Sequence, residues 1–171
     1  MKTIITLILV LSSALVFAGE VEKNLGFAAG AVSGIGLSYR QFYEKAGFQI
    51  TGAAYVDGTK ESEEYQRQFN GGLQGFYTLS KPSDVRFYLL GGVSFFYNEN
   101  RFSEEVYTME GEYAGDKIDA ELDRSYNIGT GIGMQVTFLK HANIAIEWPL
   151  FYNTDGSFTM YIPQIGIYYK F

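Results

Sequence analysis

The chain has 171 residues and no cysteine, and its 19 acidic residues outnumber 13 basic ones, for a formal net charge of −6. The missing cysteines exclude disulfide bonds and thiol chemistry, and an acidic chain without a cluster of Lys and Arg argues against a nucleic-acid partner. No apolar run after residue 18 is long enough to cross a bilayer as a helix, so a membrane protein with this sequence has to be a β-barrel.

Residues 1–18 have the layout of a secretory signal peptide. Lys2 supplies an early positive charge, an apolar run follows it, and Val16 and Ala18 form a plausible cleavage site. A transmembrane anchor is the alternative, but the apolar run is short and two serines interrupt it. We therefore expect cleavage after Ala18 and a single outer-membrane β-barrel domain in residues 19–171.

Apolar and polar residues alternate along the first half of that domain, which is the period of β-strands with two unlike faces. The strands predicted here are residues 25–31, 35–43, 48–56, 65–79 and 85–98. Tight turns at 44–47 and 80–84, and hydrophilic loops around residue 33 and at 57–64, separate them. The first strand is rich in glycine and has the weakest pattern.

The longest connection, residues 99–123, is strongly acidic. Six of its carboxylates are Glu104, Glu105, Glu110, Glu112, Asp116 and Asp119. Apolar residues and two glycines within the segment predict a hairpin that projects beyond the fold. One interpretation is a solvated extension without a ligand. The other is a binding site for divalent cations that bridge lipopolysaccharide phosphates, or for a surface protein that pairs with a strand edge.

The last part of the chain contains three more predicted strands, at residues 124–138, 144–152 and 158–171, joined by a tight turn at 140–143 and a loop at 153–157. The final strand has an apolar face of Tyr161, Pro163, Ile165, Ile167, Tyr169 and Phe171. Its other face carries Gln164, Gly166, Tyr168 and Lys170. An open sheet edge is not tolerated in hydrocarbon, so the first strand must pair with the last. The pattern predicts an all-β, eight-stranded antiparallel up-and-down transmembrane barrel.

The apolar faces are expected to contact lipid, because Arg or Lys at the bilayer midplane on a barrel's outer face costs about 2–4 kcal/mol. The residues that should point into the lumen are Arg40, Arg86, Glu147 and Lys170. Arg67 falls on the outer face but close to an external loop, where this cost is small. Arg40 and Glu147 share a depth, so we predict that they pair within a polar network that fills the lumen rather than forming a pore.

The chain ends in Phe171, which follows an aromatic and an isoleucine at alternate positions. With the export signal and the strand count, this ending resembles the OmpA/OmpX class of small outer-membrane barrels. The resemblance implies that Ile167, Tyr169 and Phe171 are recognised by the barrel-assembly machinery. It also implies a place in the bacterial outer membrane, contact with the lipid bilayer and lipopolysaccharide, and a role in envelope integrity or surface interaction without catalysis.

Two rival functions are a lipid A-modifying outer-membrane enzyme and a soluble, lipocalin-like periplasmic binding protein. A deacylase of this kind needs a serine beside a histidine on the external side. The only histidine, His141, lies in a predicted periplasmic turn with Asn143 two residues later. The sequence also has no metal-ligand spacing and no cofactor motif, so we predict no enzymatic activity, no metal and no cofactor.

Overall fold

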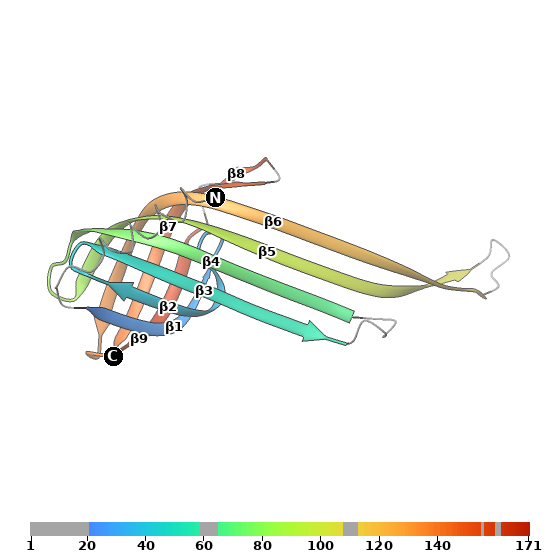
Figure 1. The fold of residues 1–171 in the computed structure, drawn as a ribbon, viewed down its shortest axis with the longest axis horizontal. Helices are drawn as coiled ribbons and strands as arrows, with labels where there is room; N and C mark the ends of the chain where they lie inside the picture. The colour runs from blue at the N-terminus through green and yellow to red at the C-terminus, as the bar shows by residue number, and fades with distance from the viewer. Residues whose placement is uncertain (1–20, 59–64, 108–112, 155, 160–161) are drawn as a thin grey trace, which may run out of the picture.

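The computed structural model describes residues 21–58, 65–107, 113–154, 156–159 and 162–171, which form a closed barrel with a long extension (Figure 1). The strands are β1 (Glu22–Gly30), β2 (Gly34–Phe42), β3 (Ala46–Asp57), β4 (Tyr65–Ser80), β5 (Val85–Tyr107), β6 (Tyr113–Phe138), β7 (Ala142–Asn153), β8 (Phe158–Thr159) and β9 (Gln164–Lys170). Eight of them form the barrel, as predicted, and the two-residue β8 pairs with the outer end of β7. The described part of the chain holds no helix long and apolar enough to cross a membrane.

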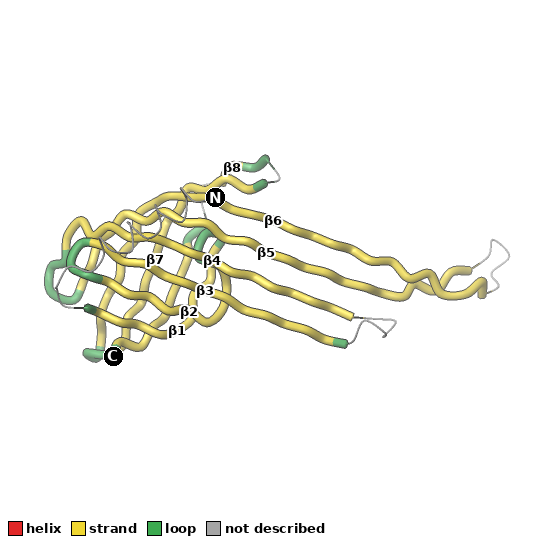
Figure 2. Tube along the Cα trace, viewed as in Figure 1, coloured by secondary structure: helices red, strands yellow, loops and turns green. Residues whose placement is uncertain are grey.

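All neighbouring strands are antiparallel. Two of the pairings that close the barrel join strands that are not consecutive in the sequence. β1 pairs with β9, through residue pairs such as Leu25 with Tyr169, and β7 pairs with both β6 and β9. The predicted contact between the first and last strands is therefore confirmed. Figure 2 shows the continuous strands around the barrel, with short loops at the end where β1 begins.

The outer surface of the barrel is apolar and its interior is polar, which confirms the predicted orientation of the strands. Exposed residues on the outside include Leu37, Ile50, Leu73, Ile132, Trp148 and Ile167. Buried residues on the inside include Asn24, Ser38, Gln49, Gln74, Gln135 and Asn143. A soluble protein would bury the first group and expose the second, so the exposed apolar belt indicates a hydrocarbon environment.

Two strand boundaries differ from the prediction. β1 begins at Glu22 rather than at residue 25, because Glu22 and Asn24 continue the inward-facing polar set. The predicted strand 158–171 is divided into β8 and β9, and Pro163 lies in the gap, where a residue without an N–H group does not interrupt the ladder. Tyr161, which was assigned to the outer face, lies outside the described residues.

A four-stranded sheet extends beyond one end of the barrel (Figure 1). β5 and β6 have 23 and 26 residues, and their backbones pair from Val85 with Val136 to Tyr107 with Tyr113. The predicted acidic connection is therefore mostly regular strand. β2 pairs with β3 only as far as Gly52, and β7 pairs with β6 only as far as Asn127, so among the described residues no strand covers the outer edge of β3 or of β6 within the extension.

Candidate functional site

A buried ion pair lies at the centre of the lumen. The Arg40 Nη2 atom is 2.5 Å from Glu147 Oε1, and the two side chains are 1% and 3% exposed. Arg40 comes from β2 and Glu147 from β7, with β1 and β9 between them in the barrel order, so the contact crosses the lumen. The structure thus brings together the two residues that were expected to share a depth.

Neutral polar side chains surround this pair. The Tyr88 hydroxyl donates to Glu147 Oε1 at 2.8 Å, and Arg40 Nη1 donates to the Tyr88 oxygen at 2.9 Å. Arg40 Nε donates to Gln49 Oε1 at 2.7 Å, and the Tyr168 hydroxyl donates to the same atom at 2.9 Å. Because a buried charge without partners is costly, this closed set of donors and acceptors is what makes the pair tolerable in the interior.

Aromatic rings fill the space beside the guanidinium group of Arg40. Its Cζ atom lies 4.7 Å from the Phe76 ring centroid and 4.6 Å from that of Tyr168, close enough for cation–π attraction. Phe42, Phe76 and Tyr88 pack against one another with centroid distances of 5.1 to 5.7 Å. The lumen at this level is a packed core, as expected for an eight-stranded barrel.

A second charged cluster lies at the end of the barrel where β1 begins and the short turns lie, called here the turn end. It depends on Glu22, a residue that the sequence prediction missed. Glu22 Oε2 lies 3.1 Å from Arg86 Nη2, 3.4 Å from Lys81 Nζ and 3.8 Å from Lys170 Nζ. Gln135 Nε2 donates to the other carboxylate oxygen of Glu22 at 2.8 Å. Arg86 and Lys170 therefore share one acidic partner, Glu22 of β1, which is separate from the ion pair between β2 and β7.

The connection between β1 and β2 folds into the lumen instead of forming an exposed loop, which corrects the prediction for residue 33. Val32 and Ser33 are 0% and 2% exposed. The Gln164 Oε1 atom accepts hydrogen bonds from Val32 N at 2.6 Å and Ser33 N at 2.8 Å. Asn127 Nδ2 donates to the Ala31 carbonyl at 3.0 Å, so the turn is held from both sides.

Glycine makes room for this inward turn. A Cβ atom on Gly72 would overlap the Ser33 carbonyl group, and Gly34 begins β2 with a φ of 76°, a conformation that other residues rarely adopt. Gln164 also links the turn to the central pair, because its Nε2 atom donates to Glu147 Oε2 at 3.0 Å. Residues 31–33 thus close the end of the lumen next to the extension.

The three residues that the barrel-assembly machinery was expected to recognise lie on the outer face of the barrel, near the turn end. Ile167, Tyr169 and Phe171 are 57%, 59% and 62% exposed. The Phe171 amide donates to the Lys23 carbonyl at 3.1 Å, which ties the end of the chain to β1.

Only some of the acidic residues predicted for the hairpin lie within the described part of the chain. Glu104 and Glu105 lie on β5, and Asp116 and Asp119 on β6, where the backbone pairs Glu105 with Asp116. Glu110 and Glu112 lie outside the described residues.

The one histidine of the chain lies at the turn end of the barrel. His141 Nδ1 lies 3.2 Å from the Lys170 carbonyl oxygen, and its ring stacks on Tyr169 at the turn end, away from the extension. Within the described ranges, no group of three or more His, Asp and Glu side chains is positioned to hold a metal ion.

Comparison with known proteins gives distant structural likenesses. No protein-family model matches the sequence, and no curated protein does. The N-terminal β-barrel domain of Pseudomonas aeruginosa OprF superposes with a TM-score of 0.47 at 15% identity, covering 88% of this chain and 96% of that one. Ail, the attachment invasion locus protein of Yersinia pestis, superposes with a TM-score of 0.45 at 15% identity, covering 91% and 100%.

Proposed function

We propose that the protein is a non-enzymatic outer-membrane barrel that anchors a rigid external sheet, and that this sheet pairs with a strand of another surface protein. The observation that carries the proposal is the pairing of β5 with β6 far beyond the barrel, which is regular from Val85 to Val106. A filled lumen and an apolar outer belt support a role as an anchor.

The dimensions support a membrane-spanning barrel. On β6, the outward-facing residues from Tyr126 to Phe138 cover about 40 Å of strand, or about 29 Å of depth at a tilt of about 45°. This matches the thickness of a hydrocarbon core. The part of β6 before Tyr126 adds about 40 Å of strand length outside the bilayer.

The edges of the extension support strand addition as the mode of binding. In the part of the chain that the structure describes, no strand pairs with the side of β6 that faces away from β5 between Tyr113 and Ser125. A row of unpaired backbone groups of this kind is a template for a strand from another protein. For this reason we propose that the partner is a protein.

Replacing residues 103–118 with an Asn-Gly turn tests this function. Phe102 pairs with Asp119 in the ladder, so a two-residue turn closes the shortened hairpin in register. We expect cells that express the shortened barrel to lose adhesion to protein-coated surfaces, while the barrel keeps its different gel migration before and after heating. Unchanged adhesion and unchanged sensitivity to divalent cations would argue against the proposal.

A variant with altered charge distinguishes binding through the strand edge from binding through the acidic side chains of the hairpin. Glu121→Gln together with Asp123→Asn removes two exposed carboxylates but leaves the β6 backbone in place. We expect adhesion to remain with this variant. A loss equal to that of the shortened hairpin would show that charge, and not the edge, mediates contact.

A further inference from the structure

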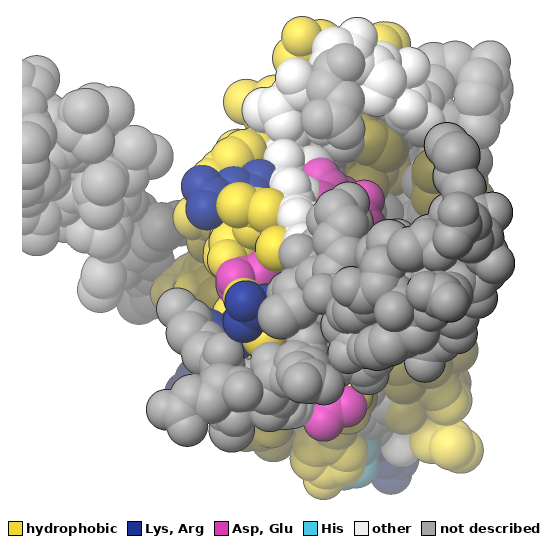
Figure 3. Space-filling view, turned by 90° about the vertical axis from the view of Figure 1, so that its right-hand side faces the viewer, with side chains coloured by type: hydrophobic (Ala, Val, Ile, Leu, Met, Phe, Trp, Pro, Cys, Tyr) yellow, Lys and Arg dark blue, Asp and Glu magenta, His cyan; other side chains and the backbone are white. Residues whose placement is uncertain are grey.

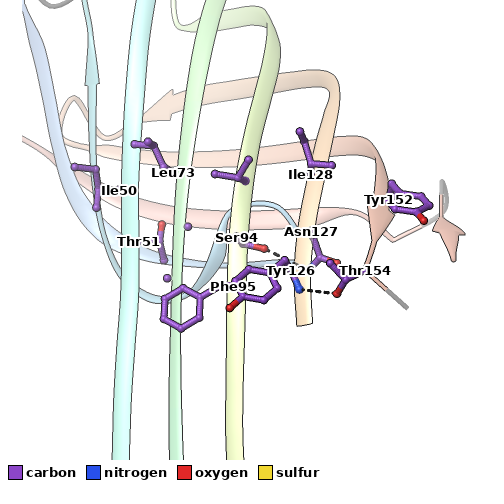
Figure 4. A pocket seen from close by; sticks show the side chains of 13 residues that line it. Ile50, Thr51, Leu73, Ser94, Phe95, Tyr126, Asn127, Ile128, Tyr152 and Thr154 are labelled. Atoms are coloured by element: carbon purple, nitrogen blue, oxygen red, sulfur yellow. Dashed lines mark hydrogen bonds between the residues drawn. The ribbon is translucent and has the colours of Figure 1, made fainter. Parts of the chain in front are cut away.

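The uncovered edge of β6 begins where its contact with the end of β7 stops. The Tyr126 amide donates a hydrogen bond to the Thr154 hydroxyl at 3.2 Å (Figure 4). The Thr154 amide donates in return to the Tyr126 carbonyl at 3.0 Å. Thr154 directly follows β7, and among the described residues no strand lies against the same side of β6 from residue 125 back to Tyr113 (Figure 1). Residues 113–125 are called here the β6 edge.

The even-numbered residues of β6 present their backbone groups to this edge. Both the N–H and the C=O group of Tyr126 point away from β5, toward Thr154. The ladder with β5 runs without a register shift from Val136 to Gly115, so the same direction recurs at every second residue, from Arg124 back to residue 116. An added antiparallel strand must therefore form its hydrogen-bonded pairs with these even-numbered residues.

The charges along the β6 edge restrict which strand can be added. Six of its residues are charged: Asp116, Lys117, Asp119, Glu121, Asp123 and Arg124. Charged edge strands resist pairing with an arbitrary strand, because like charges directly opposite each other are destabilising. Figure 3, viewed from the end at which the extension projects, shows acidic and basic side chains among hydrophobic ones. The edge therefore favours a strand whose charges follow the complementary order.

The β6 edge has this complementary order in its own sequence. In an antiparallel ladder with Ala120 opposite Ala120 of a second copy, Leu122 is opposite Ile118 and Arg124 is opposite Asp116. All of these positions are even-numbered, so the backbone groups match as well. Because the ladder is symmetric, the apolar pair and the ion pair each occur twice.

The odd-numbered positions distinguish this register from its neighbours. Asp123 is opposite Lys117, which adds two opposite-charge pairs, while Glu121 is opposite Asp119, which adds two repulsive pairs. Sliding one strand by two residues in either direction leaves only two opposite-charge pairs or none. Opposite charges directly across a ladder stabilise it, so the register centred on Ala120 is the preferred one.

We propose that the strand added to the β6 edge is the β6 edge of a second copy of this chain. The inference rests on the proposed function and names the partner of the same edge. Within one membrane, all copies of β6 run in the same direction, from the external end into the barrel. An antiparallel ladder therefore joins copies in two facing membranes, and the protein links these membranes through one continuous sheet.

Disulfide formation at a single position tests the register. The chain has no cysteine, so Ala120→Cys introduces the only thiol. Residue 120 lies opposite itself, with the two Cα atoms about 5.5 Å apart, which suits a disulfide. In Leu122→Cys the two thiols are offset by four residues, or about 13 Å, which is too far. We expect mild oxidation in phospholipid vesicles to give a disulfide dimer with Ala120→Cys and none with Leu122→Cys.

Exchange of charges tests the identity of the partner. Arg124→Glu places two carboxylates opposite each other, and Asp116→Arg places two guanidinium groups opposite each other. Each variant alone should cluster vesicles about tenfold less well than the native protein, measured by dynamic light scattering. Vesicles with Arg124→Glu mixed with vesicles with Asp116→Arg should cluster again, because opposite charges then face each other at both positions. Lys140→Glu, the same charge change at the turn end, should leave clustering unchanged.

Two double variants test the centre of the ladder. Asp119→Asn with Glu121→Gln should strengthen clustering severalfold, because it removes the repulsive pairs. Glu121→Gln with Asp123→Asn removes the repulsion and one kind of ion pair together, so clustering should stay near its native level. Heat-dependent gel migration is measured for every variant to show that the barrel is folded.

Three results would overturn the inference: native vesicles that do not cluster, mixed charge variants that do not regain clustering, or a disulfide that forms as readily with Leu122→Cys as with Ala120→Cys. A failure of the proposed function is distinguishable from these results. If the shortened hairpin loses adhesion to protein-coated surfaces but native vesicles do not cluster, the edge binds a different protein and only this inference is wrong. If the shortened hairpin keeps its adhesion, the proposed function itself is wrong.

Discussion

Arg40→Gln is expected to lower the free energy of unfolding by about 3–5 kcal/mol, because it leaves Glu147 buried without its cationic partner. Glu147 keeps hydrogen bonds from Tyr88, Gln74 and Gln164, but these donors are neutral. Glu147→Gln should be similarly costly, because it leaves the Arg40 guanidinium group unpaired in a site from which water is excluded.

The double variant distinguishes a true pair from two independent losses. Arg40→Gln with Glu147→Gln should cost about 2–3 kcal/mol less than the sum of the single variants. The measurement is urea-induced unfolding in lipid vesicles, followed by the fluorescence of Trp148. Arg124→Gln is the matched control, since this exposed arginine should change stability by less than about 0.5 kcal/mol. A coupling energy near zero would show that the pair does not act as a unit.

Gln164→Leu is expected to release the inward turn between β1 and β2. The substitution removes the acceptor for the buried amides of Val32 and Ser33 and one donor to Glu147. A buried polar group without a partner costs about 1–3 kcal/mol, so we expect a total loss of about 2–4 kcal/mol in the free energy of unfolding.

Amide hydrogen exchange measured by NMR shows whether this loss is located at the turn. The amides of Val32 and Ser33 should exchange at least about tenfold faster in Gln164→Leu. In this variant the turn can open without breaking hydrogen bonds to residue 164, because leucine offers no acceptor. Gln135→Leu is the control, since Gln135 is equally buried but contacts Arg40 and Glu22 instead of the turn. Slow exchange of both amides in Gln164→Leu would contradict the assigned role of this residue.

Alternation of apolar and polar residues was sufficient to predict the barrel, its strand order and the direction of each face. It was sufficient because lipid and lumen impose opposite demands on neighbouring residues, as the exposed Ile167 and buried Tyr168 of β9 illustrate. Counting residues from the turns also placed Arg40 and Glu147 at one depth. Strand periodicity therefore carries information on the position of a side chain along the barrel as well as on its face.

The remaining features depend on contacts that periodicity does not encode. Glu22 was missed because Lys23 breaks the apolar pattern on the outer face, which placed the start of the first strand too late. A signal was present, since Glu22 and Asn24 continue the inward polar set. The inward turn at residues 31–33 was not predictable in this way, because it depends on the distant Gln164 and on the space beside Gly72.

The single tryptophan provides the most direct test of a lipid-facing apolar surface. Trp148 is 46% exposed on the outside of β7, at the level of Ile132 on β6. In vesicles whose acyl chains carry bromine, we predict strong quenching of Trp148 fluorescence, and little quenching by aqueous iodide. Quenching by iodide without quenching by brominated lipid would place Trp148 in water and contradict a membrane-spanning barrel.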